Sequence, residues 1–286
     1  MAAIIGVAPQ SWPALAPARA REIKQRLPQI IQAALGGGIA DLDNFLPRLE
    51  VSEKRLGKTV TRQVTFSEFL SVPQDHPNHR FDILGHTLAM VRWFQADPAI
   101  GNQATPAVLL AALLHDIGKP QTKAKPMPAK VAVEQWHGLP KPGQVAQKLG
   151  SRLRAYLRPE TFEVFDGEKT EKRVKHQFLG HEKEGVPAAT AVAKALGLSA
   201  TEVDQIACLV ELHTSIVMLL SSMVGHNVAL SQQPTTKEKT SITKAKGKAI
   251  TKFVAEMVPE LEKAGVSIDV ALAFGRADIL AAQGEG

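Results

Sequence analysis

The sequence predicts an all-α fold with one small β-hairpin. Most of the chain carries apolar residues at helical spacing, whereas the alternation typical of strands is confined to short segments. Hydrophobic residues make up 44% of the 286 positions, which is typical of a globular protein with a sizeable core. We expect a helical N-terminal extension over residues 1–70 and a helical bundle over residues 71–286, with insertions near 120–160 and 225–250.

The N-terminal extension is predicted to begin with a helix over residues 18–35, where apolar residues recur at helical spacing. Three consecutive glycines then end this helix. A short helix is expected over residues 40–49, and a brief extended segment over residues 59–66.

The bundle is predicted to start with two helices, over residues 81–94 and 106–117. Thr105 suits the N-cap of the second helix, because its hydroxyl is placed to accept a hydrogen bond from a first-turn amide. Ser199 and Glu202 form a capping-box pattern before a later helix. The remaining helices are expected over residues 187–196, 200–213, 254–261 and 268–282.

Both insertions have a composition that interrupts the helical pattern. Prolines and lysines alternate after residue 120, and an amphipathic helix is expected over residues 145–157. Residues 162–178 then resemble a hairpin with its turn near Asp166-Gly167. The second insertion is lysine-rich among serine, threonine and glutamine, a composition that does not readily bury a core.

Charge and cysteine content narrow the class of protein. The net charge of +6 favours anionic partners such as nucleotides or nucleic acid. Cys208 is the only cysteine, so no intramolecular disulfide can form and a reducing compartment is expected. No uninterrupted apolar run approaches the roughly 20 residues of a membrane span, so we expect a cytoplasmic protein without a membrane-spanning segment.

The adjacent residues His115 and Asp116 are the most informative feature of the chain, because they stand at the end of an otherwise apolar helix. Burying a carboxylate beside an imidazole is costly unless it is compensated, and a divalent metal is the usual compensation. Other candidate ligands lie on or beside apolar, helix-periodic stretches; they are His86, His181, His213 and Asp278. The set predicts a metal site.

The order His, His-Asp, His, His, Asp resembles the HD-domain superfamily of metal-dependent phosphohydrolases. The flanking segments are similar to the HD domain attached to bacterial CCA-adding tRNA nucleotidyltransferases; they are Val72-Pro73-Gln74-Asp75-His76-Pro77, Gly85-His86-Thr87-Leu88, His115-Asp116-Ile117-Gly118-Lys119-Pro120 and Phe178-Leu179-Gly180-His181-Glu182. The resemblance covers residues 71–282. The nucleotidyltransferase head is not expected, because only two residues separate Gly36-Gly37-Gly38 from Asp41-Leu42-Asp43, which leaves no room for the required strand. Addition of nucleotides to tRNA is therefore not the expected activity.

The resemblance implies an HD-type helical bundle that binds one or two divalent metal ions. Its minimal ligand set for one ion is His86, His115, Asp116 and Asp278. His181 and His213 would complete a second site in which Asp116 bridges the ions. Imidazole and carboxylate ligands suit manganese, iron, cobalt, nickel or zinc, and magnesium is also possible.

The expected activity is hydrolysis of a phosphomonoester or phosphodiester, in particular of a nucleotide, by a metal-activated water. Asp116 is expected to be catalytic as a ligand. Lys119 and Arg276 are expected to bind the substrate phosphate and to assist catalysis, and Lys183 to bind it. Each of these three cations also has a simpler interpretation as a surface charge paired with a nearby acid.

Two other functions remain open from the sequence. An RNA- or tRNA-associated binding module on an HD scaffold is suggested by the basic segments 120–130 and 237–252. A nucleotide-sensing regulator would bind its ligand without turnover. The complete ligand set favours catalysis, while substrate, native metal and oligomeric state are left open.

Overall fold

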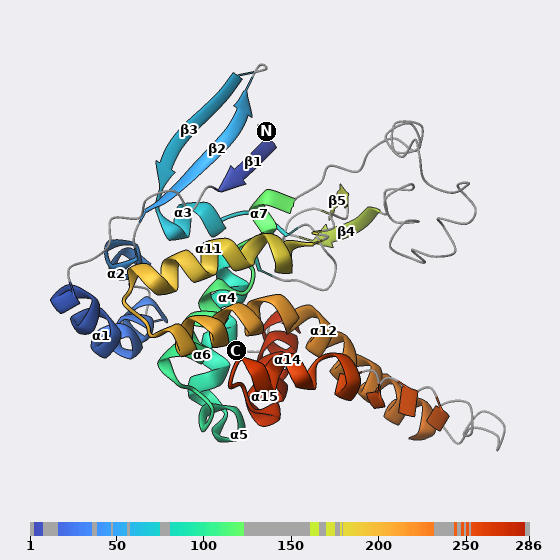
Figure 1. Cartoon of the computed structure of the whole chain (residues 1–286). Helices are drawn as coiled ribbons and strands as arrows, with labels where there is room; N and C mark the ends of the chain where they lie inside the picture. The colour runs from blue at the N-terminus through green and yellow to red at the C-terminus, as the bar shows by residue number, and fades with distance from the viewer. Residues whose placement is uncertain are drawn as a thin grey trace, which may run out of the picture.

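Figure 1 shows the computed structural model of the chain. The described residues are 3–7, 17–35, 39–46, 48–55, 58–74, 81–122, 161–165, 170–174, 178, 180–231, 243–244, 247–248, 250–251 and 253–283. Helices dominate these residues, as the all-α prediction expects.

The N-terminal part combines helices with a three-stranded antiparallel sheet of order β1-β2-β3. Its elements are β1 (Ala3–Val7), α1 (Pro17–Leu35), α2 (Ile39–Phe45), β2 (Leu49–Arg55), β3 (Lys58–Val64) and α3 (Phe66–Leu70). The helix predicted over 18–35 and the extended segment predicted over 59–66 are confirmed as α1 and β3.

The prediction of a helical N-terminal extension was incomplete, because it omitted β1 and β2. Residues 40–49 were expected to be one helix, but α2 ends at Phe45 and β2 begins at Leu49. The strand was hard to recognise because only Leu49 and Val51 alternate as buried apolar residues before charged residues follow. Strand pairing across the sheet, with Leu49 opposite Val64, was not visible in the local pattern.

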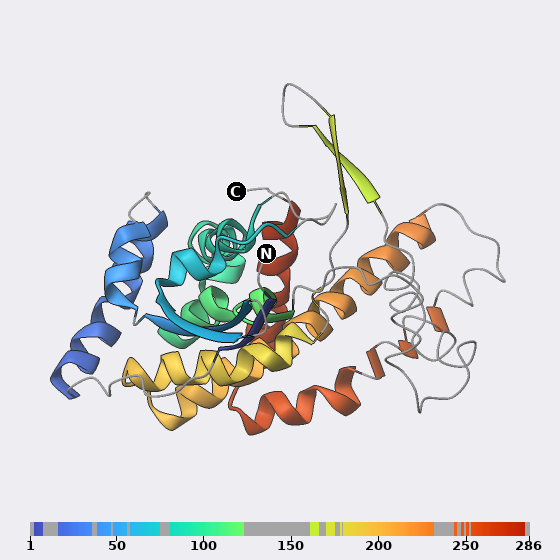
Figure 2. The ribbon, with the colours of Figure 1, turned by 90° about the horizontal axis from the view of Figure 1, so that it is seen from above.

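The bundle follows in the order α4 (Ile83–Ala96), α5 (Pro98–Gly101), α6 (Pro106–Leu114), α7 (Lys119–Thr122), α11 (His181–Ala195), α12 (Ala200–Ser231), α14 (Val258–Lys263) and α15 (Ile268–Gln283). Helix α12 packs against α6, α11 and α15, and α4 packs against α6 and α15. Every residue of α6 after its first is buried. The five helices α4, α6, α11, α12 and α15 therefore surround a common interior, as Figures 1 and 2 show.

Capping hydrogen bonds define the starts of the helices that the sequence indicated. The Thr105 hydroxyl accepts a hydrogen bond from the Val108 amide at 3.2 Å, which confirms the predicted N-cap of α6. The Glu202 carboxylate accepts a hydrogen bond from the Ser199 amide at 2.9 Å, which confirms the capping box before α12. The helix predicted over residues 187–196 begins earlier in the structure. Helix α11 starts at His181 and contains Pro187 in its interior.

The N-terminal helices share the hydrophobic core of the bundle. Leu27 of α1 and Leu42 of α2 are fully buried and belong to the same apolar cluster as Leu110 of α6. Helix α1 contacts both α4 and α6. The N-terminal part thus supports the two helices that lead to the predicted metal ligands.

The predicted hairpin is present as β4 (Thr161–Phe165) paired with β5 (Thr170–Val174). Its expected turn, the amphipathic helix expected over 145–157 and most of both insertions lie outside the described residues. Helix α12 continues to Ser231 and so occupies the beginning of the expected second insertion. The basic segments 120–130 and 237–252 likewise lie mostly outside the described part of the chain.

Part of α12 corrects one expectation about apolar segments. The stretch Ala200–Met223 has a mean hydropathy of 1.7 and is long and apolar enough to cross a membrane, the one such helix among the described residues. It escaped notice because Glu202, Asp204 and Glu211 interrupt the apolar run while the mean hydropathy of the stretch stays high. The same length and composition occur in core helices, and α12 packs here against α6, α11 and α15.

Candidate metal centre

The six predicted metal ligands converge in the interior of the bundle, and all of them are buried. They come from five regions of the chain: His86 from α4, His115 and Asp116 from the turn after α6, His181 from the start of α11, His213 from α12, and Asp278 from α15. Packing of these helices against one another therefore assembles the site.

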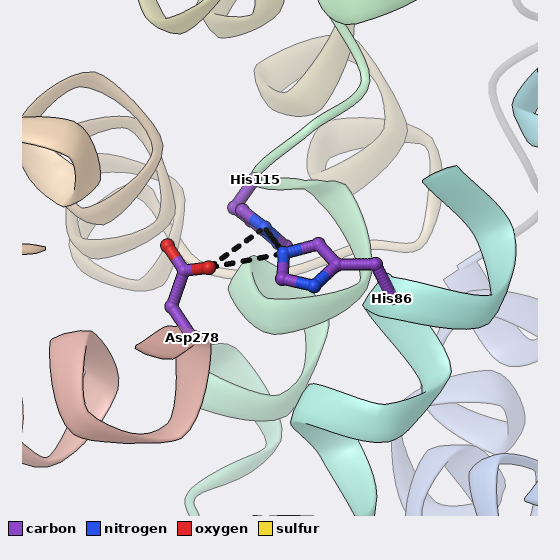
Figure 3. A group of neighbouring side chains, drawn as sticks. All are labelled: His86, His115 and Asp278. Carbon is purple, nitrogen blue, oxygen red and sulfur yellow. Dashed lines mark hydrogen bonds and ion pairs between the residues drawn. The ribbon is translucent and has the colours of Figure 1, made fainter. Parts of the chain in front are cut away.

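One group, which we call the first half-site, consists of His86, His115 and Asp278 (Figure 3). The Nε2 atom of His86 lies 3.0 Å from Oδ1 of Asp278 and 3.2 Å from Nε2 of His115. Three different helical regions thus direct one ligand atom each toward a common point.

A second pair of imidazoles, His181 and His213, forms what we call the second half-site, with their Nε2 atoms 3.0 Å apart. Oδ1 of Asp116 lies 3.3 Å from Nε2 of His181 and 3.7 Å from Nε2 of His213. Oδ2 of the same carboxylate lies 3.3 Å from Nε2 of His115. Asp116 therefore stands between the half-sites, with one oxygen toward each.

The hydrogen bonds of three imidazoles orient their Nε2 atoms toward the centre. The Nδ1 atoms of His115, His181 and His213 lie 2.8, 2.6 and 2.7 Å from the carbonyl oxygens of Ala112, Phe178 and Val210. A carbonyl only accepts, so each Nδ1 carries the proton and donates it. Each ring consequently directs its Nε2 atom toward the centre, where the unprotonated Nε2 of a neutral ring can act as a metal ligand.

The spacing of the ligand atoms fits divalent metal ions. Two ligands at about 2.1 Å from one ion are about 3.0 Å apart at an octahedral angle and about 3.4 Å apart at a tetrahedral one. The closest contacts within each half-site are 3.0 Å, and Asp116 lies 3.3 Å from one imidazole of each half. The donor set of nitrogen and carboxylate oxygen is that of a borderline transition metal.

Both carboxylates are held ionised by their neighbours. Burial raises the pKa of Asp116, but the charges of His115 and Lys119 and hydrogen bonds outweigh it and hold the pKa well below its usual range. Burial likewise opposes ionisation of Asp278, whose pKa is nevertheless lowered by the hydrogen bond from His86 and by nearby imidazoles. Two negative charges in a buried site favour a cation there.

Two imidazoles of the site, His213 and His115, have pKa values shifted in opposite directions. Burial, followed by the charges of His115 and His181, lowers the pKa of His213 to about 3, so its Nε2 lone pair is available at neutral pH. Burial also opposes protonation of His115, but the charge of Asp116 outweighs it and the pKa is raised. The buried carboxylate thus favours the protonated form of His115, whereas burial keeps His213 neutral.

Three cations were predicted to bind the substrate phosphate, and of these Lys119 lies beside the metal ligands. Its side chain is buried, and Nζ lies 2.6 Å from Oδ2 of Asp116. Nζ also lies 2.7 Å from Oε1 of Gln74 and 5.6 Å from the centre of the Phe178 ring. The sequence pattern included Gln74 only as a member of the segment 72–77 and predicted no role for it. Its position in that segment was the one feature of the sequence that could have pointed to a role.

The other two predicted cations are not brought to the cluster in the same way. Arg276 is 56% exposed, and its Nη2 lies 3.0 Å from Oδ2 of Asp97 at the start of α5. Residues two positions apart on a helix are about 200° apart, so Arg276 points away from the side occupied by Asp278. The expected catalytic and phosphate-binding role of Arg276 therefore has no geometric support. Lys183 is exposed in the first turn of α11.

Residues next to the ligands complete the surroundings, and sequence reasoning assigned them no role. Oε2 of Glu182 lies 3.2 Å from Nδ1 of His181, so this carboxylate also faces the proton of that ring. The hydroxyl of Thr214 lies 3.3 Å from Nε2 of His213. Each of these two residues directly follows a predicted ligand in the sequence, and this adjacency could have indicated its role.

Gly118 allows the turn that carries His115 and Asp116 to lie close to the start of α11. A Cβ atom at this position would lie 2.1 Å from the carbonyl oxygen of His181 and 2.7 Å from the Gly185 amide nitrogen. Because no side chain fits there, the two segments pack backbone against backbone. This contact brings Asp116 within reach of His181.

Comparisons of the chain with protein-family models, with curated proteins and with solved structures find no match. The functional interpretation therefore depends on the residues of the site and on the sequence motifs that contain them.

Proposed function

We propose that this protein is a metal-dependent phosphohydrolase that cleaves a phosphomonoester or phosphodiester, with a nucleotide as the expected class of substrate. The observation that carries the proposal is the position of Asp116, whose two carboxylate oxygens face imidazole nitrogens of different half-sites at 3.3 Å each. A carboxylate in this position is suited to bridge two divalent ions.

The residues would hold two divalent ions of the borderline class, one in each half-site. Ions bound there supply Lewis acidity, which lowers the pKa of water and neutralises charge on phosphoryl oxygens. Asp116 and Asp278 contribute the negative charge that retains them, because the pKa of each carboxyl lies below its ordinary value. His213 contributes a neutral imidazole, because its pKa of about 3 keeps it unprotonated at neutral pH.

Lys119 is the proposed phosphate-binding residue of the site. Its ammonium group adjoins the carboxylate shared by both half-sites, at 2.6 Å from Oδ2 of Asp116. A buried cation beside the reaction centre stabilises the charge that develops on phosphoryl oxygens, because the surrounding low-dielectric protein strengthens the interaction.

The motif resemblance to HD domains supports the same proposal, since it implies the same six ligands. The alternative function is RNA binding on an inactive HD scaffold. The basic segments that suggested it lie mostly outside the described residues, and no contact among the described residues favours it. A sensor that binds a nucleotide without turnover would share the ligands and is separated from the enzyme by a turnover assay.

The test compares wild-type protein with Asp116→Asn, and with Asp269→Asn as a matched control at an exposed position of α15. Metal content is measured by elemental analysis, and hydrolysis is followed on p-nitrophenyl phosphate, bis(p-nitrophenyl) phosphate and nucleotides after manganese loading. We expect Asp116→Asn to lose metal and more than about 100-fold in activity, while the control retains both. Metal-replete wild type without turnover on any of these esters would overturn the proposal.

A further inference from the structure

Gln74 is a buried polar residue that connects the segment before α4 to the metal centre. Its side chain is 2% exposed, and its Oε1 lies 2.7 Å from Nζ of Lys119. A buried amide is costly unless its polar atoms are hydrogen-bonded, so its contacts indicate a defined role.

Three partners determine which way the amide of Gln74 faces. Its Nε2 donates to the carbonyl oxygens of Phe81 and Asp82, at 3.4 and 3.3 Å. If the amide were flipped, its NH2 group would face the ammonium of Lys119 and its oxygen would face two carbonyl oxygens. Carbonyls only accept hydrogen bonds and an ammonium only donates them, so all three contacts would be unfavourable. Oε1 of Gln74 is thereby held as an acceptor for Lys119. Because Phe81 and Asp82 directly precede α4, this acceptor is anchored to the helix that carries His86.

Among the described residues, two oxygen atoms lie within 3 Å of Nζ of Lys119, so one of its three donors is not assigned to an oxygen there. An ammonium group has three N–H donors. Asp116 Oδ2 and Gln74 Oε1 lie within hydrogen-bonding distance of Nζ, at 2.6 and 2.7 Å, and the Phe178 ring lies beside it. If Gln74 did not hold Nζ, the ammonium would be free to turn its donors to Asp116, the strongest acceptor beside it.

We propose that Gln74 is a positioning residue that holds Lys119 so that its remaining donor serves an oxygen of the substrate phosphate. This inference rests on the proposed function and adds to it the residue that determines phosphate affinity. Gln74 acts through Lys119 and has no place among the metal ligands. Its loss should therefore weaken phosphate binding while the metal ions are retained.

The experiment uses the full-length, manganese-loaded protein with the variants Gln74→Leu, Gln74→Glu and Lys119→Met. Gln74→Leu removes the acceptor at similar size, whereas Gln74→Glu keeps an acceptor and opposes phosphate by charge. Gln95→Leu, an exposed glutamine of α4, is the matched control. The measurements are metal content, kcat and KM for p-nitrophenyl phosphate, and the affinity for inorganic phosphate by calorimetry.

We expect Gln74→Leu to raise KM and the dissociation constant of inorganic phosphate about tenfold, with kcat and metal content close to wild type. Gln74→Glu should weaken phosphate binding at least as much because of its added charge; if the leucine variant does not fold, unchanged phosphate affinity in Gln74→Glu would show that position 74 is not coupled to the phosphate site. In the Lys119→Met background, Gln74→Leu should have little further effect, because both changes remove the same interaction.

Unchanged phosphate affinity in the folded Gln74 variants would overturn the inference, as would a loss of metal or of kcat without a change in KM. Because inorganic phosphate binding is measured directly, this result is separate from the proposed activity. A wild-type protein whose phosphate affinity depends on Gln74 but that hydrolyses no ester would contradict the proposed function alone.

Discussion

The two half-sites share one carboxylate but are built differently. The first half-site contains its own carboxylate, Asp278, beside two imidazoles from helical regions that pack closely together. The second half-site contains two imidazoles and relies on Asp116 Oδ1 as its carboxylate oxygen. Its geometry also depends on the backbone contact between Gly118 and the start of α11.

The pKa shifts of one imidazole in each half also differ. His115 in the first half-site has a raised pKa because of Asp116, whereas the pKa of His213 in the second is lowered to about 3 by burial and by neighbouring imidazoles. The buried carboxylates of the first half therefore favour the protonated form of His115. The second half places Nε2 of His181 and Nε2 of His213 3.0 Å apart, a distance that suits two ligands of one ion.

The largest effects should come from removing one ligand of each half. Asp278→Asn is expected to empty the first half-site, and His181→Gln the second, so each variant should keep about one of two ions. Activity should fall more than about 100-fold in both, because the proposed chemistry uses both ions. Elemental analysis beside hydrolysis of p-nitrophenyl phosphate checks this expectation. Loss of both ions from Asp278→Asn would show that the halves are not separable.

Gly118→Ala should affect the second half-site selectively. The added Cβ would meet the His181 carbonyl at 2.1 Å, so the start of α11 must move away from Asp116. Overpacking of this kind costs about 1–3 kcal/mol of stability. Thermal unfolding and metal content measure the two consequences. Gly247→Ala, where a Cβ meets nothing within 4 Å, is the control, and equal behaviour of the two variants would contradict the role of Gly118.

The two histidines predict opposite pH dependences of stability in the metal-free protein. The folded-state pKa of His213 is about 3 against an ordinary 6.5, so between these values the unfolded chain binds the extra proton. Its contribution to stability is therefore lost as pH falls below about 6.5, with a slope of at most about 1.4 kcal/mol per pH unit. His115 has a raised folded-state pKa, so its contribution is complete below the ordinary value and is lost as pH rises through the folded-state pKa.

Urea unfolding of the metal-free protein across about pH 5 to pH 8 tests this difference. His213→Gln should flatten the decline in the free energy of unfolding on the acidic side. His115→Gln should remove the gain in that free energy when pH is lowered toward the ordinary histidine pKa. Parallel curves for both variants would contradict the opposite pKa shifts of His115 and His213.

The smallest effect is expected for Arg276→Gln. The guanidinium is 56% exposed and pairs with Asp97 rather than with the metal centre. An exposed ion pair contributes at most about 1 kcal/mol, and metal content should not change. Metal analysis and KM for p-nitrophenyl phosphate check this prediction, with Lys119→Met as the comparison. A large rise in KM in Arg276→Gln would place this arginine back among the phosphate-binding residues.

Local features of the chain were predictable because they depend on neighbours in sequence. The N-caps at Thr105 and Ser199 are hydrogen bonds within one helical turn, and residue types alone indicated them. Strands β1 and β2 were missed because pairing between distant segments stabilises them.

The sequence by itself determined the helical class, the longer helices of the bundle though not all of their ends, and the six residues that gather in its interior, because periodicity and ligand chemistry are properties of residue type and spacing. Only the tertiary structure decided that Asp116 stands between two half-sites, that Gln74 contacts Lys119, and that Arg276 faces Asp97 instead. The physical reason is that the direction of a side chain depends on how helices pack. That packing is set by close contacts such as the one at Gly118, between residues far apart in the chain.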